Sequence, residues 1–173
     1  MKGRIRLALA GLVALALAAG GAALTGGASA TPPDLLQAAK AAGAKFHSIE
    51  QAERAGYELA SPCVESPAGG MGFHYENPEL MADDAIDPLR PEILVYAAKP
   101  NGRPELVAIE YWKRDADGSR LTSGDRPSVL GQAFDGPMPG HSPVMPVHYD
   151  LHVWLYEANA SGMFAPFNPA IDC

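Results

Sequence analysis

Residues 147–156 carry apolar side chains at every second position, which is the pattern of a half-buried β-strand. Because strand side chains point alternately to opposite sides, Leu151, Val153 and Leu155 share one face. The opposite face carries His148, Asp150, His152 and Trp154. The segment therefore predicts a sheet with one apolar face and a second face on which metal ligands and proton carriers gather.

Four further strands are predicted around this one. The run Gly72–Glu76 places His74 between Phe73 and Tyr75. The runs Glu92–Ala97 and Glu105–Trp112 flank Pro100-Asn101-Gly102, and Asn-Gly between two apolar runs is a strong signal for a β-hairpin. Glu110 lies in the middle of the second run, a position that favours contact with water or a ligand. The last of the four strands is predicted over Val129–Phe134.

The region before the strands favours two short helices. Residues 34–42 predict the first, with Asp34 as its N-cap and Gly43 as its end. Residues 49–55 predict the second, with Ser48 and Gln51 at capping-box spacing. The expected fold class is α+β: short N-terminal helices followed by a mostly antiparallel sheet, either open or curled into a partial barrel.

Residues 135–146 predict a loop, because their prolines and glycines are incompatible with regular structure. This loop carries His141 to the start of the strand that holds His148 and His152.

The first thirty residues have the three parts of a secretory signal peptide. Lys2, Arg4 and Arg6 form a basic region, residues 7–19 are apolar, and Ala28-Ser29-Ala30 is a cleavage signal. We expect cleavage after Ala30 and a single exported α+β domain over residues 31–173. An uncleaved anchor is disfavoured, because the apolar run is short beside the roughly 20 residues that a membrane span needs.

Cleavage leaves ten basic and twenty acidic residues, a net charge of −10. Such an acidic chain is a poor binder of nucleic acid and of anionic membranes. We therefore expect no nucleic-acid partner and no stable membrane insertion after cleavage, and a small-molecule or protein partner stays open.

The two cysteines, Cys63 and Cys173, predict a disulfide, because an even pair in an oxidising compartment is normally oxidised. A catalytic thiol is disfavoured, since neither cysteine lies in a Cys-x-x-Cys motif and one of them is the last residue.

Several longer motifs resemble those of a group of small exported bacterial proteins with no established function. These motifs are Gly-Gly-Met-Gly-Phe-His-Tyr-Glu-Asn-Pro at 69–78, Gly-Pro-Met-Pro-Gly-His at 136–141, His-Tyr-Asp-Leu-His-Val-Trp-Leu-Tyr at 148–156 and Gly-Met-Phe-Ala-Pro-Phe-Asn-Pro at 162–169. The resemblance spans most of residues 50–173. It implies export, but no activity, cofactor or catalytic residue.

The histidines predict a metal site. His74, His141, His148 and His152 lie on or beside the predicted strands, with Glu110 and Asp150 as carboxylate ligands. Imidazole with carboxylate suits transition metals, and Zn or Cu is expected here. Two histidines four apart on a strand lie roughly 13 Å apart, so His148 and His152 do not share one ion unless the strand bends. The alternative is that these histidines are surface or backbone-bonded core residues.

A second class of function is a non-catalytic module that binds a small molecule, a glycan or a protein. Its ligand-binding residues would be Trp154, Asp150 and Tyr75, because aromatic faces dominate binding surfaces. A histidine with Asp150 or Glu110 also has the residue types of acid–base catalysis, but no nucleophile accompanies them. The leading hypothesis is an exported transition-metal-binding protein, and enzymatic activity stays open.

Overall fold

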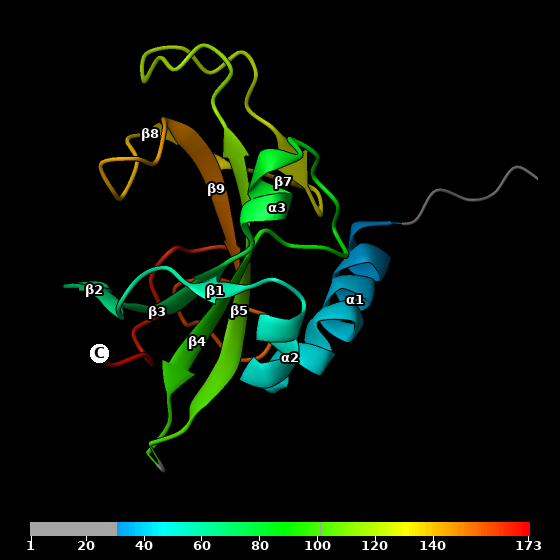
Figure 1. Cartoon of the computed structure of the whole chain (residues 1–173), viewed down its shortest axis with the longest axis vertical. Helices are drawn as coiled ribbons and strands as arrows, with labels where there is room; N and C mark the ends of the chain where they lie inside the picture. Colours follow the sequence, from blue (N-terminus) through cyan, green and yellow to red (C-terminus); the bar gives the residue numbers. More distant parts are fainter. Residues whose placement is uncertain (1–30, 101) are drawn as a thin grey trace, which may run out of the picture.

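The computed structural model describes residues 31–100 and 102–173, and its centre is a seven-stranded antiparallel sheet (Figure 1). Its main strand order is β1-β3-β4-β5-β9-β8, and β2 pairs with β3 beside this path. These strands are β1 (Glu58–Leu59), β2 (Val64–Ser66), β3 (Gly69–Glu76), β4 (Ile93–Ala98), β5 (Pro104–Arg114), β8 (Asp135–Met138) and β9 (His148–Val153). The α+β prediction is confirmed. The sheet does not close into a barrel, since β8 and β1 end its path. The predicted signal peptide lies outside the described residues.

Two helices precede the sheet, close to their predicted bounds. They are α1 (Pro32–Gly43) and α2 (Ile49–Arg54), joined by the 3-10 turn η1 (Ala44–His47). Ser48 caps α2 as predicted, with the Gln51 N–H donating to its Oγ at 3.4 Å. The predicted N-cap of α1 was wrong by about one turn. The N-cap is Thr31, and Asp34 occupies position N3 of the capping box. Two prolines at the start of a helix cost no hydrogen bond, so α1 begins with them.

A third helix, α3 (Pro78–Ala82), was not predicted. Its N-cap is Asn77, whose Oδ1 accepts the N–H groups of Glu79 (3.1 Å) and Leu80 (3.2 Å).

The predicted hairpin is confirmed as β4 and β5, which pair from Ile93 with Glu110 to Ala98 with Pro104. The predicted strand 129–134 is instead a small hairpin, β6 (Ser128–Val129) with β7 (Gln132–Ala133). Leu130 and Gly131 form its turn, with φ of 56° and 79°. The predicted loop 135–146 was wrong at its start, because β8 occupies its first four residues with a register shift at the Gly-Pro pair.

The two faces of the sheet are buried by different parts of the chain. One face packs against α1, η1 and α2 through a large apolar cluster that includes Leu94, Tyr96, Ile109, Leu151 and Val153 (Figure 1). Burial of this cluster provides the main stabilisation of the fold, at about 25 cal/mol per Å² of apolar surface. The opposite face has a small apolar cluster around Val95, Ala108, Trp154 and Ile171. The rest of that face holds polar side chains.

The predicted disulfide between Cys63 and Cys173 is confirmed, with a Cα–Cα distance of 5.5 Å. It fixes the C-terminal segment beside β2 and β3, where the Gly70 N–H donates to the carbonyl groups of Asn168 (3.1 Å) and Ile171 (3.0 Å). A disulfide is typical of proteins from oxidising compartments. Among the described residues, no helix combines the length and the apolar character needed to span a membrane.

Candidate metal centre

Three strands bring together a histidine pair and a carboxyl group on the second face of the sheet. Glu110 on β5 is the cross-strand partner of His152 on β9. His74 reaches the same point from β3, which is separated from β5 by β4. All three residues are buried, with exposed fractions of 8% for His74, 3% for Glu110 and 1% for His152. Side-chain alternation had predicted which side chains share a face of each strand. The pairing register of the strands then brings these three side chains together.

The three ligand atoms form an equilateral triangle. His74 Nε2 and His152 Nε2 each lie 3.4 Å from Glu110 Oε2, and the two nitrogens are 3.4 Å apart. Among the described residues, Glu110 Oε2 has no hydrogen-bond partner, although it is fully buried. A buried carboxyl oxygen without a partner costs stability unless a proton or a cation occupies the space beside it.

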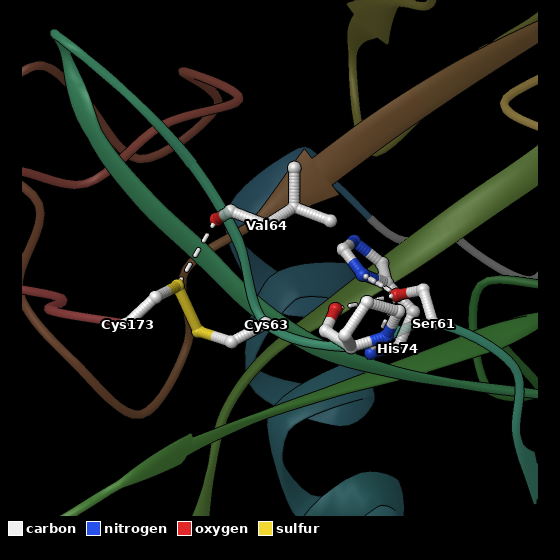
Figure 2. Close-up of a disulfide and its surroundings, with 6 residues drawn as sticks. Ser61, Cys63, Val64, His74 and Cys173 are labelled. Atoms are coloured by element: carbon white, nitrogen blue, oxygen red, sulfur yellow. Dashed lines mark hydrogen bonds between the residues drawn. A yellow bond between two sulfur atoms is a disulfide. The ribbon is translucent and has the colours of Figure 1, made fainter.

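The tautomer of His74 follows from its hydrogen bonds (Figure 2). The Ser61 hydroxyl donates its hydrogen to the Pro62 carbonyl at 3.0 Å, so its oxygen accepts the Nδ1–H of His74 at 2.9 Å. A neutral His74 therefore carries a lone pair on Nε2, directed at the triangle. Metal-binding histidines are normally held in this way by a second hydrogen bond from the other ring nitrogen.

Burial favours the uncharged form of all three groups. Desolvation, with the nearby His152 and His141, lowers the pKa of His74 to about 3. Desolvation also lowers the pKa of His152, to about 4. Burial raises the pKa of Glu110 well above its usual range, and Asp150, Glu76 and Glu92 add to this effect. The contacts of 3.4 Å are therefore not ion pairs in the metal-free protein. They join two imidazoles and a carboxyl group whose uncharged forms are favoured by burial.

The triangle fits a tetrahedral metal ion. A tetrahedral ion bonded at about 2.1 Å, as for Zn²⁺ with nitrogen and oxygen, holds its ligand atoms about 3.4 Å apart. An octahedral ion with the same bond length, about 2.1 Å, holds neighbouring ligand atoms closer, at about 3.0 Å. The 3.4 Å sides match the tetrahedral case. Among the described residues, the group consists of these three ligands.

A cavity of about 460 Å³ lies against this triangle. His74 and Glu110 line it, and most of its wall is apolar, with Val64, Met71, Ile93, Trp112, Met145 and Phe167. The space is large enough for a small organic molecule. Any ion held by the triangle therefore has a mostly apolar chamber beside it.

The other two predicted histidines form a second cluster. His141, His148 and Asp150 offer ligand atoms that lie within 4.8 Å of one another. His141 and His148 line the same cavity, but they do not join the first triangle. The structure thus separates His148 from His152, as their spacing along the strand had predicted.

Two predicted ligand-binding residues lie away from the cavity wall. Trp154 is 3% exposed, packs in the small apolar cluster and donates its Nε1–H to the Ala165 carbonyl at 2.7 Å. Tyr75 packs on Tyr96 at the opposite, helix-covered face, with ring centroids 4.9 Å apart. Asp150 lies in the second cluster.

Sequence reasoning missed Ser61 as a part of this region. Ser61 belongs to no recognisable motif. It lies close to His74 because β1 pairs with β3, and the residues after β1 continue along β3. The Ala60 N–H donates to the His74 carbonyl at 2.9 Å. Trp112 lies two residues after Glu110 on β5, and alternation correctly predicts that the two side chains share a face, since both line the cavity.

Comparisons of the chain with protein-family models, with curated proteins and with solved structures find no match.

Proposed function

We propose that the protein is an extracytoplasmic metal-binding protein that holds one Zn²⁺ ion through His74, Glu110 and His152. The observation that carries the proposal is the triangle of three buried ligand atoms with 3.4 Å sides. Cu²⁺ fits less well, because it prefers tetragonal geometry with neighbouring ligands closer together.

The electrostatics of the centre support the same conclusion. A doubly charged cation compensates the buried Glu110 carboxylate and uses the Nε2 lone pair of His74, which burial keeps neutral. His152 donates its Nε2–H to His74 in the structure and offers a second lone pair once that hydrogen moves to Nδ1. The Ser61 contact supports the required tautomer of His74. The ion replaces the proton that the carboxyl group otherwise retains.

The cavity supports binding of a small molecule beside the ion. Such an ion would supply Lewis-acid chemistry to a donor atom on that molecule. The apolar wall favours a molecule that is largely apolar and has one polar group that reaches the ion. A metal-free, non-catalytic binding module is the second candidate, and the same cavity favours it.

Metal content separates these candidates. We expect the purified, untagged protein to bind zinc in equilibrium dialysis, and we expect His74→Ala and Glu110→Gln to abolish binding at the buried centre. His47→Ala is the matched control, because His47 is exposed and packs on Tyr156, outside both clusters.

Circular dichroism checks that each variant is folded, and Glu110→Gln preserves the shape of the side chain. A folded Glu110→Gln protein that retains the zinc affinity of the native chain contradicts the proposed centre. A native protein that binds no zinc leaves the cavity as a site for a small molecule alone.

A further inference from the structure

The second cluster of the cavity consists of His141, His148 and Asp150. His148 and Asp150 lie on the same face of β9, and both are buried, at 1% and 3% exposure. His141 comes from the segment between β8 and β9 and is exposed. The cluster therefore combines two fixed ligands with one that reaches in from the solvent side.

The orientation of His148 is fixed by its neighbours. Its Nδ1 lies 3.0 Å from the Pro146 carbonyl oxygen, which can only accept, so Nδ1 carries the hydrogen. Its ring stacks on Trp112, with centroids 5.7 Å apart and an angle of 27°. Nε2, the other ring nitrogen, therefore faces the cluster, the orientation that metal-binding histidines show.

This nitrogen faces a carboxylate without a hydrogen bond between them. His148 Nε2 lies 3.7 Å from Asp150 Oδ2, beyond the usual hydrogen-bond distance. Two electron-rich atoms at this separation stabilise a cation placed between them. The ring of His141 lies 5.1 Å from that of His148, centroid to centroid, and supplies the third donor.

Two charged residues lie across the neighbouring strands from this cluster. Asp135 on β8 is the cross-strand partner of Asp150 and lies at an exposed position. On the other side, the cross-strand partner of His148 is Arg114, which is exposed, so solvent and salt screen its charge. These two neighbours are exposed and of opposite sign, so the buried ligands themselves determine what the cluster binds.

We propose that His141, His148 and Asp150 form a second cation site, which takes a divalent transition ion of the Zn²⁺ or Cu²⁺ class. The site goes beyond the buried centre and does not depend on it, since the two clusters share no ligand. Its ion lies in the same cavity, on the side where His141 meets solvent. It exchanges more readily than the buried ion, because one of its three ligands is exposed.

Zinc stoichiometry tests this site directly. In equilibrium dialysis with metal analysis, we expect two zinc ions per native chain at saturation. His141→Ala is the informative variant, because His141 is exposed and its removal leaves the core intact. We expect it to reduce the stoichiometry from two ions to one, His74→Ala to do the same, and the double variant to bind none. His47→Ala should retain two.

The outcomes distinguish the two proposals. A native chain that saturates at one ion, lost in His74→Ala and kept in His141→Ala, overturns the second site and supports the first. A single ion that is lost in His141→Ala and kept in His74→Ala supports the second site and overturns the buried centre. Two ions that both persist in His141→Ala also overturn the second site.

Discussion

Ser61 controls which nitrogen of His74 faces the candidate metal centre. Its oxygen accepts from His74 Nδ1 at 2.9 Å and, more weakly, from the His74 backbone N–H at 3.4 Å. Without this acceptor, the imidazole is free to place its hydrogen on Nε2, which then cannot bind an ion. In the proposed centre, this hydroxyl group would thus contribute to the affinity for the ion without contacting it.

We therefore expect Ser61→Ala to weaken zinc binding by about 10- to 100-fold, the range typical of a lost outer-shell partner. Competition with a chromophoric chelator measures this affinity. Ser161→Ala, at an exposed position in the C-terminal segment, is the control and should bind as the native chain does. Equal affinities for the two variants would remove Ser61 from the proposed centre.

Glu92 is a second buried carboxyl group, 1% exposed, outside both clusters. Its Oε2 accepts the backbone N–H of Trp112 at 3.1 Å. Burial raises the pKa of Glu92 to about 8, with Asp83 and Asp87 adding to the rise. The folded protein therefore binds this proton more tightly than the unfolded chain does. The stabilisation is complete below the unfolded pKa, near 4.5, and is lost as the pH rises toward 8.

The predicted consequence is that Glu92→Gln reduces the loss of stability between pH 5 and pH 8. The full shift corresponds to about 4–5 kcal/mol as an upper limit, at about 1.4 kcal/mol per pKa unit. Urea unfolding of the metal-free native and variant proteins at both pH values measures the effect. Because the charge of Glu92 also raises the pKa of Glu110, the comparison is repeated in the Glu110→Gln background, where the effect of Glu92 is isolated. If the free energies of unfolding of the two proteins changed with pH in the same way, ionisation of Glu92 would not destabilise the folded protein.

Among the strands, β3 depends on the absence of a side chain at Gly72. This residue has a φ of 106°, and a Cβ there would lie 2.4 Å from the Tyr96 carbonyl oxygen on β4. The close approach of the two strands places His74, two residues later, opposite Val95. The position of the metal ligand therefore depends on this glycine.

Gly72→Ala should lower the free energy of unfolding by about 1–3 kcal/mol from backbone strain alone, and by more through the clash with β4. It should also weaken zinc binding, since β3 moves away from β4. Thermal unfolding and dialysis measure the two effects. Gly124→Ala is the control, because a Cβ at Gly124 meets nothing within 4 Å and should change neither quantity.

Elements with a strong periodic pattern were predictable from sequence, and elements formed by pairing alone were not. The alternation in β9 and the apolar runs of β4 and β5 fixed their type and their buried faces. In contrast, β8 contains Gly136 and Pro137, which argue against a strand, and it forms because β9 offers it a free edge. The two-residue strand β1 likewise depends on β3.

The candidate site was predictable as a set of residues and not as a geometry. Alternation placed His148, Asp150 and His152 on one face and singled out Glu110 and His74. It could not group them, because the grouping depends on strand order and register: β4 separates β3 from β5, and Glu110 pairs with His152. Their spacing separated His148 from His152, but the sequence did not show which of the other ligands joins each of them.

At the scale of the whole molecule, the disulfide joins residues 110 positions apart. Closing a loop of this length restricts the unfolded chain and contributes up to about 4–5 kcal/mol in the chain-entropy model. The disulfide also holds the C-terminal segment against Gly70. This segment contributes Phe167 to the wall of the cavity.

We expect the double variant Cys63→Ser, Cys173→Ser to lose about 2–5 kcal/mol of unfolding free energy. Denaturant unfolding measures this loss, and addition of a reductant should destabilise the native chain to the same level. The double variant serves as its own control, because a reductant should leave it unchanged. A native chain insensitive to complete reduction would show that the tail is held by its packing alone.

The triangle of the buried centre draws its corners from β3, β5 and β9, so its last ligand is separated from its first by 78 residues. Nothing short of a nearly complete chain can assemble it. An ion bound at the proposed centre would therefore require β9 to be in place, and it would link strands that are not all neighbours. We expect the amide hydrogens at the centre of the sheet to exchange with solvent more slowly in the presence of zinc than in its absence. The exchange of the amide hydrogens of α1 and α2, on the other face, should not change.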